Sequence, residues 1–284
     1  LKDVPKETRA ETWYGADENF SRKVGQKGWI GLNWPKEHGG AGRSSMERYV
    51  ILEEMLTAGA PVGAHWISDR QSGPLIIRYG TEKHQKELLP GILKGESYFC
   101  IGMSEPDSGS DLAALRTKAE KKGDIYLVNG TKLWTSGAHR CQYMIALFKT
   151  SQEEDRHGGF SQFIVDLSLP GVTIRPIIDL AGRHHFNEVI FEDVEVPEDM
   201  LIGTEGNGWN QVTAELALER SGPERYLSSY MLLQELVNEF SNKNDDEGVT
   251  EIGRQMSHLT TLRQMSVSVA GMLDQGENPA LEAS

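Results

Sequence analysis

The spacing of apolar residues divides the chain into a helical stretch, a strand-rich stretch and a second helical stretch. In residues 46–56, which follow Ser45, apolar side chains recur every three or four positions, the period of a helix with one buried face. The same reasoning predicts further helices over residues 20–27, 74–79 and 81–94. A cluster rich in proline and glycine, residues 34–42, interrupts them. We therefore expect the first hundred residues to be all-α.

From residue 98 the pattern changes to short β-branched and aromatic runs separated by turn residues, which predicts strands. We expect these strands over residues 98–103, 117–121, 125–128, 132–135, 143–149, 162–166, 172–176 and 187–196. The dipeptide Asn129-Gly130 accepts positive φ at both positions and predicts a tight hairpin. Short strands at this spacing are typical of a small barrel or sandwich.

Helical periodicity returns after Gly208 in two long stretches, residues 209–240 and 249–273, joined by a polar linker. Pro223 lies inside the first stretch, and because proline has no N–H to donate, we expect the helix to bend there. Residues 276–284 predict a turn and the start of another helix. The order α, then β, then α excludes a Rossmann fold, in which strands and helices alternate and Gly-x-Gly-x-x-Gly follows the first strand.

The composition is that of a folded protein of two or three domains. The 284 residues carry 29 Lys and Arg against 42 Asp and Glu, a net charge of −13 without a dense basic tract, so we expect no nucleic-acid partner. The longest apolar run, residues 143–148, is far shorter than the roughly 20 residues that span a bilayer, so we expect no membrane span. Cys100 and Cys141 are the only cysteines, which fits a reducing compartment.

Three segments carry residue types that can hold a ligand or act on one. The first follows an apolar strand and reads Met-Ser-Glu-Pro-Asp-Ser-Gly-Ser-Asp over residues 103–111. Pro106 fixes one backbone angle, Gly109 accepts positive φ, and three serines supply hydroxyl groups on one turn. Such a turn can hold the oxygen-rich edge of a ligand, although an ordinary connection between strands has the same composition.

The second segment, residues 132–138, places the Trp134 indole beside the hydroxyls of Thr135 and Ser136. This arrangement suits the flat face of an aromatic cofactor, and the alternative is a tryptophan of the core.

The third segment lies on the first late helix, where Glu219 precedes the expected bend at Pro223. A carboxylate beside a bend can point into a cavity, where the loss of water makes it a stronger base. The alternative is a solvated helix face with pairs of glutamate and arginine.

Several familiar signatures are missing from the sequence. It has no cysteine pair with zinc spacing, no P-loop, no Gly-x-Ser-x-Gly elbow and no His-Glu-x-x-His. His184 and His185 are adjacent rather than one helical turn apart, so we expect a surface pair and no metal site.

Taken together and in this order, the segments resemble the acyl-CoA dehydrogenase family. The resemblance rests on residues 101–111 and 132–136, on Trp-Pro-Lys-Glu-His-Gly-Gly at 34–40, on Phe-Asn-Glu-Val-Ile-Phe-Glu-Asp-Val-Glu-Val-Pro at 186–197 and on Gly-Asn-Gly-Trp at 206–209. Several motifs in the family's order, spread over nearly the whole chain, are a far more specific signal than any one of them.

The resemblance implies a multidomain α and β fold. Residues 1–97 would form an N-terminal α-helical domain, and residues 98–205 a central β-barrel. Residues 206–284 would form a C-terminal four-helix bundle that is only partly present in this chain, with about two helices expected beyond its end.

The resemblance also implies FAD as the cofactor. The Ser104 hydroxyl would bond the pyrimidine edge of the flavin, Trp134 would pack against the isoalloxazine, and Thr135 with Ser136 would contact its N5/O4 side. The full set of implied cofactor-binding residues is Ile101, Met103, Ser104, Gly109, Ser110, Trp134, Thr135 and Ser136.

For the substrate, Ser110 would lie near the thioester and pantetheine arm of an acyl-CoA, and Arg220 would border the active site. In most members the glutamate that removes the α-proton lies late in the chain, in a stretch absent here. Isovaleryl-CoA and long-chain acyl-CoA dehydrogenases carry it on the first bundle helix, immediately before that arginine. Counted from Gly208-Trp209, Glu219 matches this position, so the resemblance implies Glu219 as the general base.

The implied reaction converts an acyl-CoA thioester to a trans-2-enoyl-CoA, as in the β-oxidation of fatty acids. The base takes the α-hydrogen as a proton, hydrogen bonds to the thioester oxygen stabilise the developing enolate, and the β-hydrogen leaves as hydride to flavin N5. The electrons would pass to an electron-transfer flavoprotein. Two alternatives are an acyl-CoA oxidase on the same scaffold and a non-catalytic flavin-binding subunit of a hetero-oligomer.

By the same resemblance the protein would be a homodimer or homotetramer. It would be cytoplasmic, or lie in the mitochondrial matrix of a eukaryote with its transit segment absent. The sequence departs from the family at the acidic linker around Asp245 and Asp246, where members carry Arg-x-x-Phe-Gly with an arginine that reaches the FAD of a neighbouring subunit. This departure leaves pyrophosphate binding and the subunit contact open.

Overall fold

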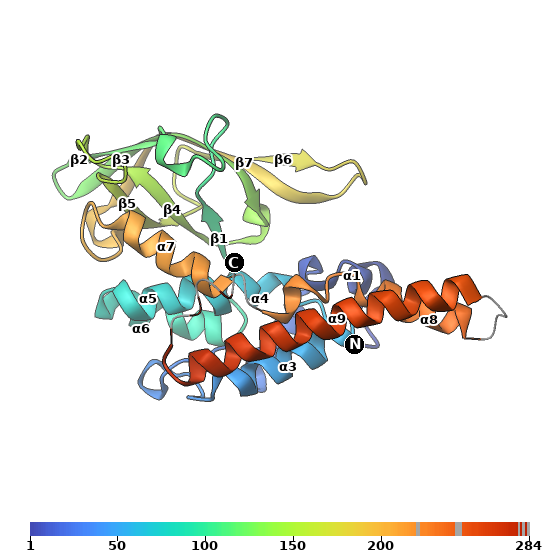
Figure 1. Cartoon of the computed structure of the whole chain (residues 1–284). Helices are drawn as coiled ribbons and strands as arrows, with labels where there is room; N and C mark the ends of the chain where they lie inside the picture. The colour runs from blue at the N-terminus through green and yellow to red at the C-terminus, as the bar shows by residue number, and fades with distance from the viewer. Residues whose placement is uncertain (220–221, 242–245, 278, 280–281, 283–284) are drawn as a thin grey trace. The chain divides into compact units, whose positions relative to one another are not determined.

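The computed structural model of the chain describes residues 1–219, 222–241, 246–277, 279 and 282, except for the side chains of residues 12 and 214–219. The chain forms two compact units (Figure 1). The helical unit consists of Leu1–Trp66, Leu93–Gly95 and Leu216–Ser284, and the sheet unit consists of Ile67–Ile92 and Glu96–Glu215.

The helical unit is built from helices that come from the two ends of the chain. They are α1 (Lys6–Ala10), α2 (Glu18–Gln26), α3 (Ser45–Thr57), α4 (Gly63–Ile67), the end of α7 (Gly208–Glu219), α8 (Tyr230–Phe240) and α9 (Asp246–Asp274). A capping box starts α3: the Ser44 hydroxyl accepts from the Glu47 N–H at 3.0 Å, and the Glu47 carboxylate accepts from the Ser44 N–H at 2.9 Å. The prediction of a helix over 46–56 is confirmed.

The first late stretch is not one bent helix, as the sequence predicts, but two helices with a break. α7 ends at Glu219, a 3₁₀ turn spans Pro223–Arg225, and α8 begins only at Tyr230. Pro223 sits at the first position of this turn, where its missing N–H costs nothing, and so starts a new element instead of kinking an old one.

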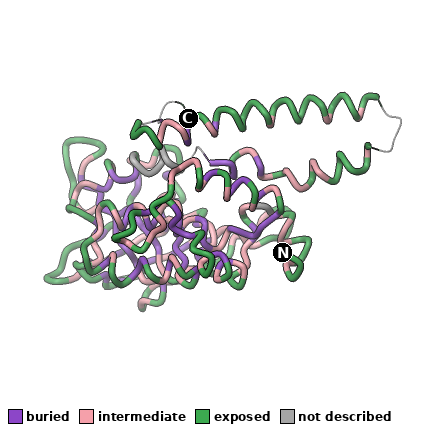
Figure 2. Tube along the Cα trace, turned by 90° about the horizontal axis from the view of Figure 1, so that it is seen from below, coloured by how far each residue is buried: buried purple, intermediate pink, exposed green. Residues whose placement is uncertain are grey.

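The last helix, α9, packs beside both α8 and α3 within the helical unit (Figure 1). The Asp274 carboxylate near its end accepts from the N–H groups of Ser45 at 2.5 Å and Met46 at 3.1 Å, and so caps the start of α3. Most of α9 faces solvent, and the exposed side chains of this helix include several apolar ones (Figure 2). Within the described residues, no helix is both long and apolar enough to cross a membrane.

The sheet unit contains a curled, half-barrel sheet, the start of α7 and two further helices. The two further helices are α5 (Gly73–Tyr79) and α6 (Glu82–Leu93), and the strands are β1 (Phe99–Gly102), β2 (Lys118–Lys122), β3 (Ile125–Ser136), β4 (Tyr143–Lys149), β5 (Phe160–Asp166), β6 (Val172–Ile178) and β7 (His184–Pro197). They form one seven-stranded sheet in the order β1-β4-β2-β3-β7-β6, with β5 paired to β4. The chain therefore has the predicted fold class, with N-terminal helices, a central half-barrel and C-terminal helices.

The hairpin predicted at Asn129-Gly130 is wrong. The β2–β3 turn lies at Gly123-Asp124, and β3 runs through Asn129 and Gly130 while paired to β7. Asn129 and Asp193 exchange two hydrogen bonds of 2.9 Å across these strands, and Gly130 has φ +146° where a Cβ would meet Thr117 at 2.5 Å. The positive φ of Gly130 therefore lies within a strand and not in a turn, and the adjacent β-bulge has its extra residue on β7, where Asp193 has φ +50°.

A buried carboxylate, Glu53 on α3, joins three parts of the helical unit. It accepts from Tyr49 at 3.1 Å, from Tyr226 at 2.8 Å, and from Arg263 of α9 through two bonds of 2.7 and 2.9 Å. Burial acts to raise the pKa of Glu53, but the hydrogen bonds from Arg263, Tyr226 and Tyr49 outweigh it and lower the pKa below the ordinary 4.5. The cluster therefore ties α3 to α9 and to the segment after the 3₁₀ turn.

We predict that Glu53→Gln lowers the free energy of unfolding of the helical unit by roughly 2 kcal/mol, because it removes a charge-assisted pair from a nearly enclosed site. Since the folded pKa lies below the unfolded one, the contribution of Glu53 is complete above pH 4.5 and is lost as the pH falls through the folded pKa. Urea unfolding followed by circular dichroism at pH 7 and pH 3 measures both effects.

The matched control is Arg254→Gln, which breaks an exposed ion pair with Glu251 on the same helix α9 and should change stability by less than about 0.5 kcal/mol. Equal losses from the two variants would contradict the prediction.

Candidate functional site

Two segments singled out in the sequence lie together in the sheet unit. The loop after β1 carries residues 103–111, and the end of β3 carries residues 132–136. The Leu133 N–H donates to the Ser104 carbonyl at 2.8 Å, and the Lys132 ammonium donates to the Met103 carbonyl at 3.1 Å. The two segments are therefore joined by the backbone and by a side chain.

The junction is completed by a buried ion pair between Lys132 and Glu105, 2.7 Å apart and 0% and 7% exposed. Glu105 also accepts from the N–H groups of Arg116 at 2.6 Å and Thr117 at 3.0 Å. Burial lowers the pKa of Lys132 to about 8 against the effect of Glu105, so the ammonium form still predominates at pH 7. Burial acts to raise the pKa of Glu105, but Lys132 and the N–H donors lower it, so the pair is ionised on both sides.

Sequence reasoning missed this ion pair. The signal was present, because the strand period of two places Lys132 on the same face as Tyr126 and Val128, both fully buried. A lysine on the apolar face of a strand requires a partner, and Glu105 in the neighbouring motif is that partner.

A β-bulge changes the direction in which the side chains at the end of β3 point. Lys132 pairs with Val189 and Thr135 pairs with Asn187, so β3 has one residue more than β7 between these points. Trp134, inside the bulge, has φ +61°, a strained conformation for an aromatic residue, and its side chain is 56% exposed. The alternative of a core tryptophan is therefore wrong, since the indole lies at the surface.

Next to the exposed indole lies a polar edge. Thr135 is 1% exposed, and its hydroxyl has no hydrogen-bond partner among the described residues, whereas Ser136 is half-buried. On the other segment, the Ser108 hydroxyl is likewise buried without a partner in the described part of the chain. Buried hydroxyls without partners are rare in folded proteins, and a polar ligand can satisfy them. An exposed flat ring beside a polar edge fits the rim and face of a flavin.

The remaining candidate residues of the first segment surround a tight turn, closed by hydrogen bonds between Glu105 and Ser108 of 2.8 and 3.2 Å. Gly109 does not adopt the positive φ that the sequence analysis allowed for it. Ile101, Met103 and Ser104 are half-buried, whereas Gly109 and Ser110 are exposed.

Two candidate residues, Glu219 and Arg220, fall partly or wholly outside the described residues. Glu219 is the last residue of α7 and belongs to the helical unit, but its side chain lies outside the description, as does the whole of Arg220. Asp245 of the acidic linker also lies outside the described residues. Among the residues that the structure describes, no group of three or more His, Cys, Asp or Glu could hold a metal ion.

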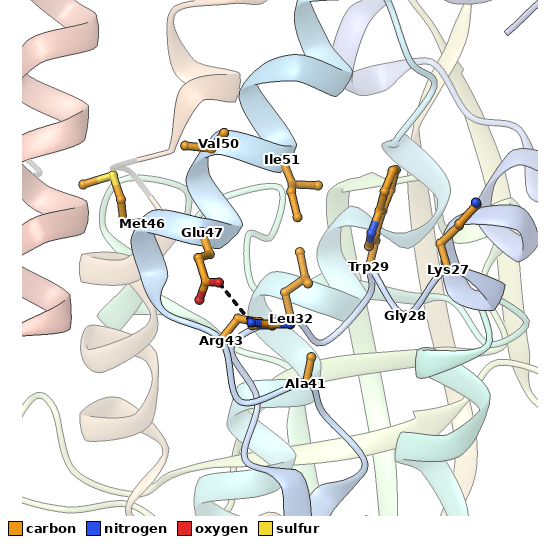
Figure 3. Close-up of a pocket in the computed structure, with 10 residues that line it drawn as sticks. All are labelled: Lys27, Gly28, Trp29, Leu32, Ala41, Arg43, Met46, Glu47, Val50 and Ile51. Atoms are coloured by element: carbon orange, nitrogen blue, oxygen red, sulfur yellow. Dashed lines mark hydrogen bonds and ion pairs between the residues drawn. The ribbon is translucent and has the colours of Figure 1, made fainter.

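A separate pocket of about 700 Å³ opens on the helical unit (Figure 3). Apolar side chains, among them Trp29 and Ile51, line it together with the Arg43–Glu47 ion pair, whose atoms are 3.2 Å apart. None of the candidate residues from the sequence lines this pocket, so it does not belong to the site formed by the two segments.

Comparison with known proteins identifies the family. Models of the acyl-CoA dehydrogenase N-terminal and middle domains match residues 2–96 and 100–194. The solved structure titled "Tcur3481-Tcur3483 steroid ACAD" has a TM-score of 0.90 and 30% identity, and the match covers 99% of this chain and 74% of that one. The chain belongs to the acyl-CoA dehydrogenase family. Members of this family are FAD-dependent oxidoreductases.

Two further relatives agree with this assignment. The ChsE4-ChsE5 complex from Mycobacterium tuberculosis has a TM-score of 0.84 and 32% identity, over 98% of this chain and 74% of that one. Acyl-CoA dehydrogenase FadE29 from the same species is 40% identical over 234 residues, which cover 81% of this chain. This chain spans 59% of the length of FadE29.

We predict that Lys132→Met destabilises the sheet unit by about 3–5 kcal/mol, because Glu105 would keep a buried charge without its counter-ion. The double variant Lys132→Met/Glu105→Gln should recover part of the loss. Thermal unfolding of the cofactor-free protein, followed by circular dichroism, gives the comparison.

Lys121→Met serves as the control, since Lys121 forms an exposed ion pair with Glu198 in the same unit, and its replacement should lower stability much less. A Lys132 variant as stable as the Lys121 variant would rule out the structural role of the buried pair.

Proposed function

We propose that the chain carries out FAD-dependent α,β-dehydrogenation of an acyl-CoA thioester to a trans-2-enoyl-CoA. The observation that carries the proposal is the bulge at the end of β3, which presents the Trp134 indole at the surface beside the unpartnered Thr135 hydroxyl. Membership of the acyl-CoA dehydrogenase family supports the same reaction.

The flavin would be held by the two segments that the buried ion pair joins. Ser104 would bond its pyrimidine edge, Trp134 would cover one face, and Thr135 with Ser136 would bond the N5/O4 side. The other predicted cofactor-binding residues, from β1 and the loop after it, are Ile101, Met103, Gly109 and Ser110.

Proton removal would fall to Glu219, the last residue of α7. Its carboxylate would take the α-hydrogen of the acyl group as a proton, while Arg220 would border the site and Ser110 would lie near the thioester arm. Bound FAD supplies the redox step by accepting the β-hydrogen as hydride.

We predict that Glu219→Gln abolishes the anaerobic bleaching of bound flavin by acyl-CoA, with at least a 10³-fold loss of rate, while FAD stays bound, because the variant lacks the base. Stopped-flow absorbance of the FAD-loaded protein is the measurement.

Glu215→Gln is the matched control, since Glu215 lies one turn earlier on the same helix, and it should bleach at nearly the wild-type rate. Wild-type bleaching that survives in Glu219→Gln would place the base at another residue.

The acyl group is best defined with a panel of straight-chain, branched and steroid-linked acyl-CoAs. The steroid compounds are included because the Tcur3481-Tcur3483 protein is titled a steroid ACAD.

An electron-transfer flavoprotein is the proposed electron acceptor, and an oxidase is the alternative. We predict that the flavin, once reduced by substrate, reacts with O₂ in minutes or more slowly but passes electrons rapidly to an electron-transfer flavoprotein. Stopped-flow reoxidation with each acceptor separates the two functions. Rapid reoxidation by O₂ alone would identify an oxidase.

A hetero-oligomer is a specific alternative to the predicted homodimer or homotetramer. Two similar structures are titled with pairs of proteins, Tcur3481-Tcur3483 and ChsE4-ChsE5, which keeps open the role of a flavin-binding subunit with a second chain. A cytoplasmic location and a role in β-oxidation stay predictions.

A further inference from the structure

The Asn187 side chain is fully buried on β7, directly opposite Thr135 of the predicted flavin edge. Its Nδ2 donates to the Thr135 carbonyl at 3.0 Å, and its Oδ1 lies 2.7 Å from Nε2 of His184. Because a carbonyl can only accept, the amide orientation is fixed, and Oδ1 must accept from an Nε2–H of His184. A bulge interrupts the regular ladder of backbone bonds, so the Asn187 side chain supplies the donor for the Thr135 carbonyl.

The His184 ring is itself held by a second histidine. It stacks on His139, with the ring centroids 3.8 Å apart and the planes inclined by 19°. Partial burial, with the charges of His184, Arg140 and His185, lowers the pKa of His139 to about 4 against a hydrogen bond from the ring to Asn187 that acts to raise it. The His139 ring is therefore uncharged at pH 7. The rings of His139 and His184 can stack closely because they do not both carry a positive charge.

A backbone bond completes the arrangement, since the Gly137 N–H donates to the His185 carbonyl at 2.9 Å. Residues 184–187 thus hold residues 135–139 at three points: the Thr135 carbonyl, the Gly137 N–H and the His139 ring. We call residues 184–187 the clamp. The residues between the held points include Ser136, one of the two hydroxyl residues of the flavin edge.

We propose that Asn187, held by the stacked rings of His184 and His139, is a positioning residue that fixes the Thr135–Ser136 edge for the flavin. The inference rests on the proposed function, because it takes this edge as the flavin contact. The clamp contributes no group to the reaction. It fixes the strained end of β3, whose other side is fixed by the Lys132–Glu105 pair.

The clamp gives His184 a role other than the surface pair expected from the sequence. His184 and His185 are both half-buried, and each holds the β3 end through a different group, a ring in one case and a carbonyl in the other. Replacement of a ring or an amide in the clamp should therefore alter the flavin environment more than it alters the fold.

The test uses Asn187→Ala and His184→Phe in the full chain. His184→Phe keeps a flat ring against His139 but cannot donate to Asn187, so it remains informative if Asn187→Ala does not fold. We expect Asn187→Ala to raise the Kd for FAD roughly tenfold and His184→Phe to raise it about threefold. Both should also change the visible absorbance of the bound flavin. Titration of the cofactor-free protein with FAD gives the Kd and the spectrum.

Asn129→Ala is the matched control, because Asn129 bridges the same two strands at their other bulge through its bonds with Asp193. It should lower thermal stability by a similar amount and leave the Kd and the spectrum unchanged. We also expect Ser136→Ala and Asn187→Ala to be coupled, so that the double variant loses less affinity than the product of the single losses.

Wild-type Kd and spectrum in folded His184→Phe and Asn187→Ala would overturn the positioning role and leave the proposed function standing. A wild-type chain that binds no FAD would overturn the proposed function and this inference with it. Equal effects of Asn129→Ala and Asn187→Ala on the Kd for FAD and on the spectrum would overturn the positioning role and show that the clamp supports only the fold.

Discussion

The candidate site depends on one buried ion pair, Lys132 with Glu105. Two ionised groups taken from water cost several kcal/mol each, and their attraction offsets this cost only with close geometry and further hydrogen bonds. Here both conditions are met, since the pair is 2.7 Å apart and Glu105 also accepts from two backbone N–H groups. Movement of either segment alone would leave a buried charge without its partner. The ion pair therefore holds the loop after β1 and the end of β3 in one relative position.

That constraint explains how a strained bulge can persist. A large aromatic residue at positive φ, such as Trp134, costs on the order of 1–3 kcal/mol and is kept only where its surroundings leave no alternative. The ion pair fixes the chain before the bulge, and the hydrogen bond from Asn187 to Thr135 fixes it after. Between them the chain has one residue more than the opposite strand, and the indole is held at the surface, where its ring meets Phe186 edge-to-face.

Much of the fold could be predicted from the sequence because apolar periodicity reports burial directly. The helix over 46–56 and most strands follow from it, and the family follows from the order of the motifs. At Asn129-Gly130 and at Pro223, the structure formed differs from the one that the residue types predict. Gly130, with its positive φ, lies within a strand because β7 pairs across it, and Pro223 starts a new 3₁₀ turn instead of bending a helix. Neither outcome is decided by residues near in sequence.

The residues that support the candidate site were even harder to predict from the sequence. The residue types at 104 and 134–136 predicted contacts with a polar ligand edge and an aromatic cofactor, and the resemblance to the family made that cofactor a flavin. The groups that hold these segments, Glu105, Lys132 and Asn187, lie inside the recognised motifs, yet nothing in the motifs showed which partner each would bind. Their roles arise from pairing between segments 27 to 52 residues apart. A binding edge can be recognised from its own residues, because the ligand's chemistry selects them. The supporting residues are selected only by the geometry of the edge, so any side chain that satisfies the same carbonyl or charge would serve, and the sequence alone cannot identify which one does.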